Sequence, residues 1–389
     1  MNEADPPETL RRRTSEKWGT FPADVLPMFV AEMDFGLAPA IKAALRDAVE
    51  AGDTGYVSAL DTGAAAAFVG FARDSWGWSP QVDRMGVTTD VSVVIVESLR
   101  RLIQPGAGVI ITPPVYPPFF DLVPEAGGTA VEVPLLDDGA GYALDLGGID
   151  RALAAGARGV LLCNPHNPVG LVHSRDQLAE LSAIVAAHDG FVVSDEIHAP
   201  LIHRGHAFTP YLTVSDAARE HGIAAESGSK AFNLAGLKTA FFVAESDRMT
   251  KLVASLPAEV TYRAGLFGLI ATRVGFADSR DWLAATVAAI EHNLAVLDRE
   301  LAAKLPAVRL RRPSAGYLAW LDMSALGWGP DPAQFALDQA RVALSHGPRF
   351  GSQGVGYARM NIACAPAAIV EAVGRLAQAA GAQPDLTPP

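Results

Sequence analysis

The sequence predicts an α/β fold in which a mainly parallel sheet is covered by helices on both faces. From Met85 onward, short apolar runs alternate with amphipathic stretches of helical period. This alternation is typical of parallel strands joined by helices. Half of the 389 residues are hydrophobic and 19% are charged, which suits a globular chain long enough for two domains. Polar residues also gather directly after several apolar runs, where the ligands of such sheets bind.

The charge balance excludes some classes of partner. With 31 basic and 43 acidic residues the formal net charge is -12, which argues against nucleic acid or an anionic membrane as a partner. The N-terminal residues contain no apolar leader, and no later stretch reaches membrane-spanning length without charge or proline. We therefore expect a cytoplasmic protein. Cys163 and Cys364 cannot form a disulfide framework, and we expect both in the core.

The first elements precede the alternating region. We expect residues 8–17, which are rich in charge, to form a solvated arm, with Arg11 to Arg13 as ordinary surface residues. A proline near the first turn and helical spacing predict a helix over residues 38–45, and an alanine-rich segment predicts another over 63–71. Tyr56 lies in the loop between these helices. A tyrosine in such a place more often caps the edge of a core than serves a ligand.

Residues 85–251 carry the predicted sheet. A proline-locked turn with aromatic residues is expected over 112–119. We predict helices over 91–103, 149–155 and 176–188, and strands over 108–111, 130–133, 159–163, 191–194 and 222–225.

The chain becomes helical after Lys251, which suggests a second, smaller domain. The longest predicted helix covers residues 282–305, two strands cover 316–321 and 357–363, and a last helix covers 367–380. The glycine-rich residues 351–356 are expected to form a flexible loop. They are not a dinucleotide fingerprint, because no long buried strand precedes them and no helix begins at their end.

Three polar clusters follow three successive predicted strands. Their sequences are Asn164-Pro165-His166-Asn167-Pro168, Asp195-Glu196-Ile197-His198 and Ser227-Gly228-Ser229-Lys230. Because parallel strands end at one edge of a sheet, we expect these clusters to meet there.

Lys230 is the residue of greatest chemical interest. It stands among small and apolar residues, and partial desolvation lowers the pKa of an ammonium toward the range where the amine attacks a carbonyl. Ser227 and Ser229 supply hydroxyl groups, and Lys238 supplies a second positive charge, so together they could hold a phosphate. Each feature alone also has an ordinary interpretation, since most lysines lie on a solvated surface.

The motifs in this order resemble those of the fold-type I pyridoxal-phosphate enzymes, the class I/II aminotransferase superfamily. Within it, residues 28–35, 116–119, 163–170 and 194–198 resemble the MalY/PatB-type cystathionine β-lyases, or C–S lyases. The likeness covers nearly the whole chain. It implies a mainly parallel seven-stranded sheet between helices, with a smaller α+β domain. The implied domains are an N-terminal arm with part of the small domain (1–40), a large cofactor-binding domain (41–255) and a C-terminal small domain (256–389).

The resemblance also assigns roles to individual residues. Lys230 would hold the aldehyde of pyridoxal 5'-phosphate as an imine, and Asp195 would keep the pyridine nitrogen protonated. The other residues implied to bind the cofactor are Asn167, Tyr116, His198, Ser227, Ser229, Lys238, Tyr56, Thr89, Asp90 and Val91. Arg359 would pair with the substrate carboxylate, and Asp34, Tyr116 and Asn167 would line the substrate site. Tyr56 is implied to act catalytically from a neighbouring subunit, so the resemblance also implies a homodimer.

Each of these residues, taken singly, also has a purely structural interpretation. Asn167-Pro168 is a common turn signal, Asp195 could only cap the next segment, Tyr116 could be a core residue, and Arg359 could be a surface residue. Asp90 stands where the family usually has a glycine near the phosphate, so its carboxylate must point away from that anion.

The implied reaction is α,β-elimination of cystathionine or a related cysteine thioether, which yields a thiol, pyruvate and ammonia. His198 replaces the tyrosine that is usual in aminotransferases, which weakens the assignment as an aminotransferase on the same scaffold without removing it. The sequence also leaves open a metal hydrolase built on His198, His203, His206 and Glu196, and a regulatory protein that binds the cofactor without turnover.

Overall fold

The chain folds into two compact units. The computed structural model describes residues 1–58, 63–139 and 141–381. The larger unit comprises residues 37–167 and 171–284, and the smaller unit comprises residues 1–36, 168–170 and 285–389. Their last boundary falls inside helix α13 (Arg280–Lys304). The division into domains at residues 40 and 255, which the resemblance implies, stays a prediction.

The larger unit is built on a mainly parallel sheet, which confirms the predicted fold class. Among the described residues it has seven strands in the order β2-β10-β9-β8-β7-β3-β4. Only β10 runs against its two neighbours, and the other pairings are parallel. The strands are β2 (Met85–Thr88), β3 (Gly108–Ile111), β4 (Thr129–Glu132), β7 (Gly159–Cys163), β8 (Phe191–Asp195), β9 (Gly222–Glu226) and β10 (Ala240–Val243).

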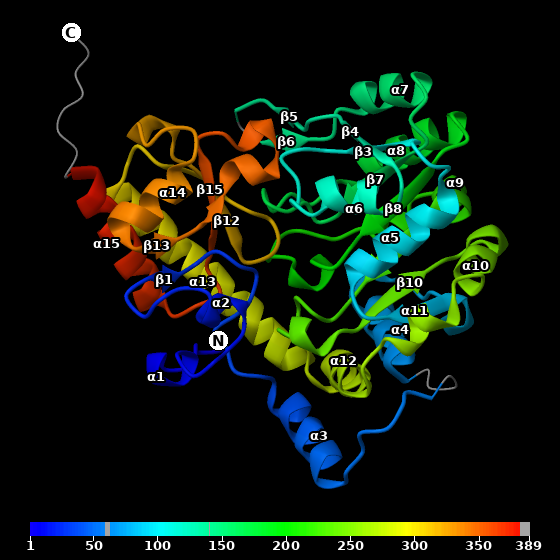
Figure 1. The fold of residues 1–389 in the computed structure, drawn as a ribbon, viewed down its shortest axis with the longest axis horizontal. Coiled ribbons are helices and arrows are strands. Elements are labelled where there is room, and N and C mark those ends of the chain that lie inside the picture. The colour runs from blue at the N-terminus through cyan, green and yellow to red at the C-terminus, as the bar shows by residue number, and fades with distance from the viewer. Residues whose placement is uncertain (59–62, 140, 382–389) are drawn as a thin grey trace. The chain divides into compact units, whose positions relative to one another are not determined.

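Helices cover both faces of this sheet (Figure 1). Every residue of β7, β8 and β9 is buried, which requires packing on each side. Helix α5 lies against β8, β9 and β10, and α8 and α9 lie against β8. The helices are α3 (Pro39–Glu50), α4 (Gly63–Trp76), α5 (Val91–Leu102), α6 (Phe119–Glu125), α7 (Leu146–Ala154), α8 (Arg175–Ala187), α9 (Asp216–His221), α10 (Asp247–Ala254), α11 (Ala258–Tyr262) and α12 (Leu266–Asp278).

The core between α5 and the sheet explains why this segment is helical. Val94, Ile95 and Leu99 recur at helical spacing and pack with residues of β3, β7, β8 and β10. Asp90 caps the helix, since its Oδ1 accepts a hydrogen bond of 3.1 Å from the backbone N–H of Val93. A small hairpin, β5 (Leu136–Asp137) with β6 (Tyr142–Ala143), completes the unit.

The smaller unit combines helices with an antiparallel sheet. Its four described strands have the order β11-β12-β15-β14, and β1 pairs with β13 in parallel. Its elements besides α13 are α1 (Pro7–Leu10), α2 (Glu16–Gly19), β1 (Leu26–Pro27), β11 (Arg309–Arg311), β12 (Leu318–Asp322), α14 (Pro332–Phe335), β13 (Val342–Ala343), β14 (Ser345–His346), β15 (Tyr357–Asn361) and α15 (Pro366–Gly381).

The glycine-rich segment contains a short turn. A 3₁₀ turn (Ser352–Gly354) follows another one (Gly347–Phe350), and the flexibility expected of residues 351–356 stays a prediction. Gly347 and Gly354 pack backbone against backbone with no space for a Cβ atom. Both cysteines are buried and unbridged, as expected. None of the helices in the described part of the chain is long and apolar enough to span a membrane.

Candidate active site

The three polar clusters meet at one edge of the larger unit's sheet. Strand β8 pairs with β7 at Asp195 and Cys163, and with β9 at Asp195 and Ala225. Asn167 follows β7, Asp195 ends β8, and Lys230 comes four residues after β9. The predicted gathering of these clusters at the carboxyl ends of the strands is confirmed.

Asp195 is a buried acid beside a lysine. Its residue is 5% exposed, and its Oδ1 accepts a hydrogen bond of 3.1 Å from the N–H of Ile197. Burial raises the pKa of Asp195 to about 7, against smaller lowering effects of that hydrogen bond and of the positive charge of Lys230. Asp195 therefore makes a local hydrogen bond to the backbone that follows it, and its buried carboxyl group would be stabilised by a nearby positive charge.

The segment before Lys230 forms a tight polar turn. The hydroxyl of Ser227 donates to the carbonyl oxygen of Thr239 over 2.7 Å and lies 2.8 Å from that of Ser229. The backbone N–H of Ser229 donates to the same Ser227 oxygen over 3.0 Å. Both serines are buried, whereas Lys230 is only partly buried. These contacts fix the turn, so that Lys230 is presented from a rigid backbone.

Lys238 and Asp90 lie together, which sequence reasoning did not foresee. Lys238 Nζ is 3.6 Å from Asp90 Oδ2, and Lys238 adopts a left-handed backbone conformation with φ of 58°. Since Asp90 also caps α5, its carboxylate has a structural task at the start of the helix. Thr89 is partly buried and Val91 is buried beside it. Helix α5 thus begins next to the lysine that was expected to bind phosphate.

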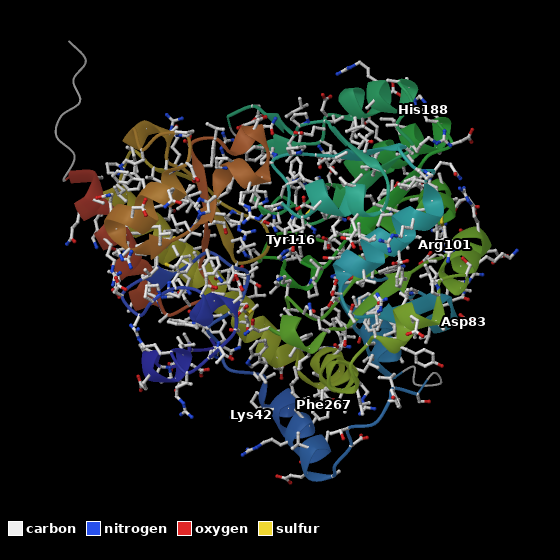
Figure 2. All side chains as sticks on the ribbon, in the orientation of Figure 1. Lys42, Asp83, Arg101, Tyr116, His188 and Phe267 are labelled. Carbon is white, nitrogen blue, oxygen red and sulfur yellow. The ribbon has the colours of Figure 1, made fainter. Side chains whose placement is uncertain are left out.

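Four further predicted residues belong to the same unit. Tyr116, labelled in Figure 2, is partly buried against the α5 core and meets Phe119 edge-on at 5.9 Å between ring centroids. Asn167 is buried, and its N–H donates to Cys163 Sγ over 3.3 Å. His198 is buried at the start of a 3₁₀ turn. Tyr56 is 97% exposed, so it does not cap a core edge of its own chain.

Arg359 and Asp34 belong to the smaller unit. Arg359 is buried, and its guanidinium donates to Phe29 O (3.2 Å) and Ser345 Oγ (3.0 Å) and lies over the Phe350 ring at 4.9 Å. The interpretation of Arg359 as a surface residue is therefore wrong. Asp34 pairs with Lys17 at 2.9 Å and accepts a hydrogen bond of 2.8 Å from Trp18 Nε1.

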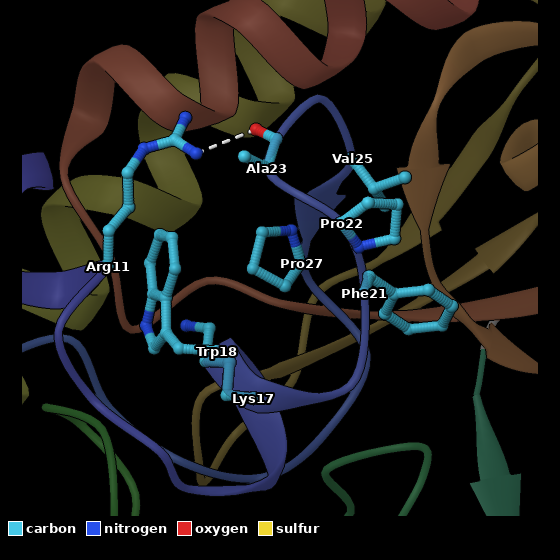
Figure 3. A pocket seen from close by; sticks show the side chains of 8 residues that line it. All are labelled: Arg11, Lys17, Trp18, Phe21, Pro22, Ala23, Val25 and Pro27. Atoms are coloured by element: carbon cyan, nitrogen blue, oxygen red, sulfur yellow. Dashed lines mark hydrogen bonds between the residues drawn. The ribbon is translucent and has the colours of Figure 1, made fainter.

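The solvated arm expected over residues 8–17 is wrong at its end. Lys17 is 1% exposed because it joins Asp34 in the interior, whereas Arg11 and Arg12 are exposed. Lys17 and Trp18 line a cavity of about 140 Å³. Figure 3 shows both side chains, together with the hydrogen bond that Arg11 donates to the carbonyl oxygen of Ala23. The sequence offered no sign of this pairing, because the two residues are far apart along the chain.

Two carboxyl groups near Asp195 were not predicted as site residues. Glu196 was named only in the polar cluster after Asp195 and in the metal hydrolase, and Glu226 was given no role. Both are fully buried. The one available signal was a glutamate at the end of an apolar strand, where burial makes a charge costly. Within the described part of the chain, no three His, Cys, Asp or Glu side chains form a group that could hold a metal ion.

The chain is similar to proteins of one family over almost its whole length. The aminotransferase class I and II family matches residues 34–376. A candidate cystathionine beta-lyase of Mycobacterium leprae (strain TN) is 40% identical over 96% of each chain. The cystathionine beta-lyase of Corynebacterium glutamicum is 34% identical over 95% of this chain and 98% of its own. A solved structure from Corynebacterium diphtheriae, described as a candidate PLP-dependent beta-cystathionase, has a TM-score of 0.94 and 30% identity, and the match covers 99% and 100% of the two chains.

Proposed function

We propose that this chain, which belongs to the class I and II aminotransferase family, is a pyridoxal-phosphate-dependent carbon–sulfur lyase. Its substrate would be cystathionine or a related cysteine thioether, cleaved to a thiol, pyruvate and ammonia. The observation that carries the proposal is the buried Asp195 at a strand end, within electrostatic reach of Lys230. The names of the relatives support the lyase over an aminotransferase.

The residues at the sheet edge fit pyridoxal phosphate. Asp195 is a buried acid whose pKa is raised by desolvation, which the charge of Lys230 offsets only in part, and a protonated ring nitrogen would add a second positive charge beside it. Serine hydroxyls, Lys238 and the first turn of α5 offer donors and positive charge for a phosphate. When bound, the cofactor supplies an electron-withdrawing ring that weakens the bonds at the substrate Cα.

Each side chain then has a defined task. Asp195 would hold the proton on the ring nitrogen, Asn167 would hydrogen bond the ring oxygen, and Tyr116 would lie against the ring. Lys230 would hold the cofactor, and its Nζ, once released by the substrate amine, would take the Cα proton. Arg359 binds the substrate carboxylate. The further residues proposed to contact cofactor or substrate are His198, Ser227, Ser229, Lys238, Thr89, Asp90, Val91 and Asp34.

The proposal extends to assembly and location. The exposed Tyr56 is proposed to reach the phosphate in a second copy of the chain, so that the protein works as a homodimer, which size-exclusion chromatography with light scattering can test. The two buried, unbridged cysteines agree with a reducing, cytoplasmic location.

The activity is tested with purified protein loaded with pyridoxal phosphate. We expect release of homocysteine and pyruvate from cystathionine, and loss of both products together with the yellow colour in Lys230→Ala. Lys251→Ala is the matched control, because Lys251 is exposed on α10. Exchange of amino groups between an amino acid and a keto acid, with neither thiol nor pyruvate formed, would refute the lyase and favour the aminotransferase.

A further inference from the structure

Glu196 and Glu226 form a buried pair directly behind Asp195. Asp195 lies opposite Ala225 in the β8–β9 pairing, and each is followed by one of the glutamates: Glu226 ends β9, and Glu196 comes directly after β8. Because side chains alternate between the faces of a sheet, the glutamate side chains project from the face opposite to those of Asp195 and Ala225. Both are 0% exposed.

The hydrogen bonds of the two glutamates are very unequal. Glu196 Oε1 accepts from Ser194 Oγ (2.8 Å), Tyr211 N (2.9 Å) and, more weakly, Asn164 Nδ2 (3.5 Å). Within the described residues, no N–H or hydroxyl group donates to Glu196 Oε2 or to either oxygen of Glu226. Continuing the Asp195–Ala225 pairing by one residue puts the two glutamates side by side on one face of the sheet, where each carboxyl group acts on the pKa of the other.

Two fully buried carboxyl groups side by side are very costly to keep ionised together, so one of them holds a proton. Three donors stabilise a negative charge on Glu196, whereas Glu226 has none, so the proton belongs to Glu226. Burial raises the pKa of Glu196 to about 7. Burial, together with the nearby charges of Glu196 and Asp195, raises the pKa of Glu226 well above its usual range. These are the titratable groups that act on Glu226, and Lys230 acts on Asp195 in turn.

We propose that Glu226 and Glu196 share one proton, and that the single negative charge left on Glu196 supports positive charge in the site in front of Asp195. Glu226 is then a positioning residue, because it supplies the donor that lets Glu196 stay ionised in the interior. A second carboxylate behind Asp195 strengthens its hold on a protonated ring nitrogen. This last step rests on the proposed function, whereas the shared proton does not.

Infrared spectroscopy tests the shared proton directly. At about pH 9, above the pKa of about 7 of both Asp195 and Glu196, the wild-type protein should still show the carbonyl band of one protonated carboxylic acid. Glu226→Gln should lose this band. Glu180→Gln, which changes an exposed glutamate on α8, should keep it.

Two results would overturn the shared proton. They are absence of the band from the wild type, or its survival in Glu226→Gln. The infrared spectrum of the wild-type protein needs no substitution, so it can still refute the shared proton if Glu226→Gln fails to fold.

The visible absorption of bound pyridoxal phosphate tests the effect on the site. The visible absorption of the bound cofactor changes with pH. In Glu226→Gln the amide still donates to Glu196, so Glu196 keeps its negative charge, and the midpoint of this pH-dependent change should match that of the wild type. Glu196→Gln removes the charge, and the midpoint should fall by roughly one pH unit. Equal midpoints in Glu196→Gln and the wild type would overturn this part. A protein that binds no pyridoxal phosphate would refute the proposed function, and the infrared band would still decide the shared proton.

Discussion

The buried ion pair between Lys17 and Asp34 allows a quantitative prediction for the smaller unit. The side chains are 1% and 5% exposed, and Nζ lies 2.9 Å from Oδ2. Replacing Lys17 with methionine keeps most of the apolar stem and removes the ammonium. The Asp34 carboxylate then stays buried without its counter-charge, which costs about 3–5 kcal/mol in comparable cases.

Other contacts of Asp34 narrow this range. Trp18 Nε1 still donates to its Oδ1 over 2.8 Å, and a hydrogen bond to a charged group contributes about 1.5–3 kcal/mol. We therefore expect Lys17→Met to lower the free energy of unfolding by about 3 kcal/mol. The double variant Lys17→Met/Asp34→Asn should lose less, because it leaves no buried charge behind.

Urea unfolding at neutral pH, followed by tryptophan fluorescence and circular dichroism, measures these differences. The control is Lys42→Met, which changes an exposed lysine on α3 (Figure 2) and should stay within about 0.5 kcal/mol of the wild type. A loss below about 1 kcal/mol in Lys17→Met, or a larger loss in the double variant than in the single one, would show that the pair does not act as a buried charge pair.

Two further predictions concern the larger unit. Asp90→Ala removes the cap of α5 and should lower the free energy of unfolding by about 1 kcal/mol, whereas Asp90→Asn keeps the cap and should lose less; equal losses in urea titrations would contradict the capping role. Burial lowers the pKa of His166 to about 3 and of His173 to about 4, so both side chains are neutral in the folded protein. In the unfolded chain the same histidines bind protons as the pH falls below their ordinary pKa of about 6.5. Their contribution is complete above about pH 6.5, and stability should fall by about 1.4 kcal/mol per pH unit for each histidine as the pH falls toward 4. His173→Gln should make the loss of stability with falling pH less steep, as measured by urea titrations at several pH values. An unchanged slope would contradict the role of His173 as a buried neutral histidine.

The elements with strong local periodicity were predicted closely. The strands at 108–111 and 159–163 match β3 and β7, and the helix at 91–103 matches α5 within one residue. Hydrophobic spacing and capping act over a few residues, so the sequence displays them directly. Strands β2 and β10 were not predicted. β10 is antiparallel, and its place between β2 and β9 depends on partners far away in the chain.

The sequence predicted the order of the site residues along the chain and the edge of the sheet where they meet, but not the contacts that they make. Asn167, Asp195 and Lys230 lie at or just after the ends of adjacent parallel strands, so their meeting point follows from the fold class alone. The salt bridge of Lys238 with Asp90 was not predicted, because it joins two turns that are distant in sequence.

The sequence by itself determined the α/β class, the order of the polar clusters and the family, because these depend on local patterns and on motifs in series. Only the tertiary structure decided which charges are buried and with which partners. In the sequence, nothing distinguishes these residues from ordinary charged surface residues: the pair Lys17 and Asp34, and the pair Glu226 and Glu196. Their chemistry changes because folding removes water from them and brings together groups that the chain keeps apart.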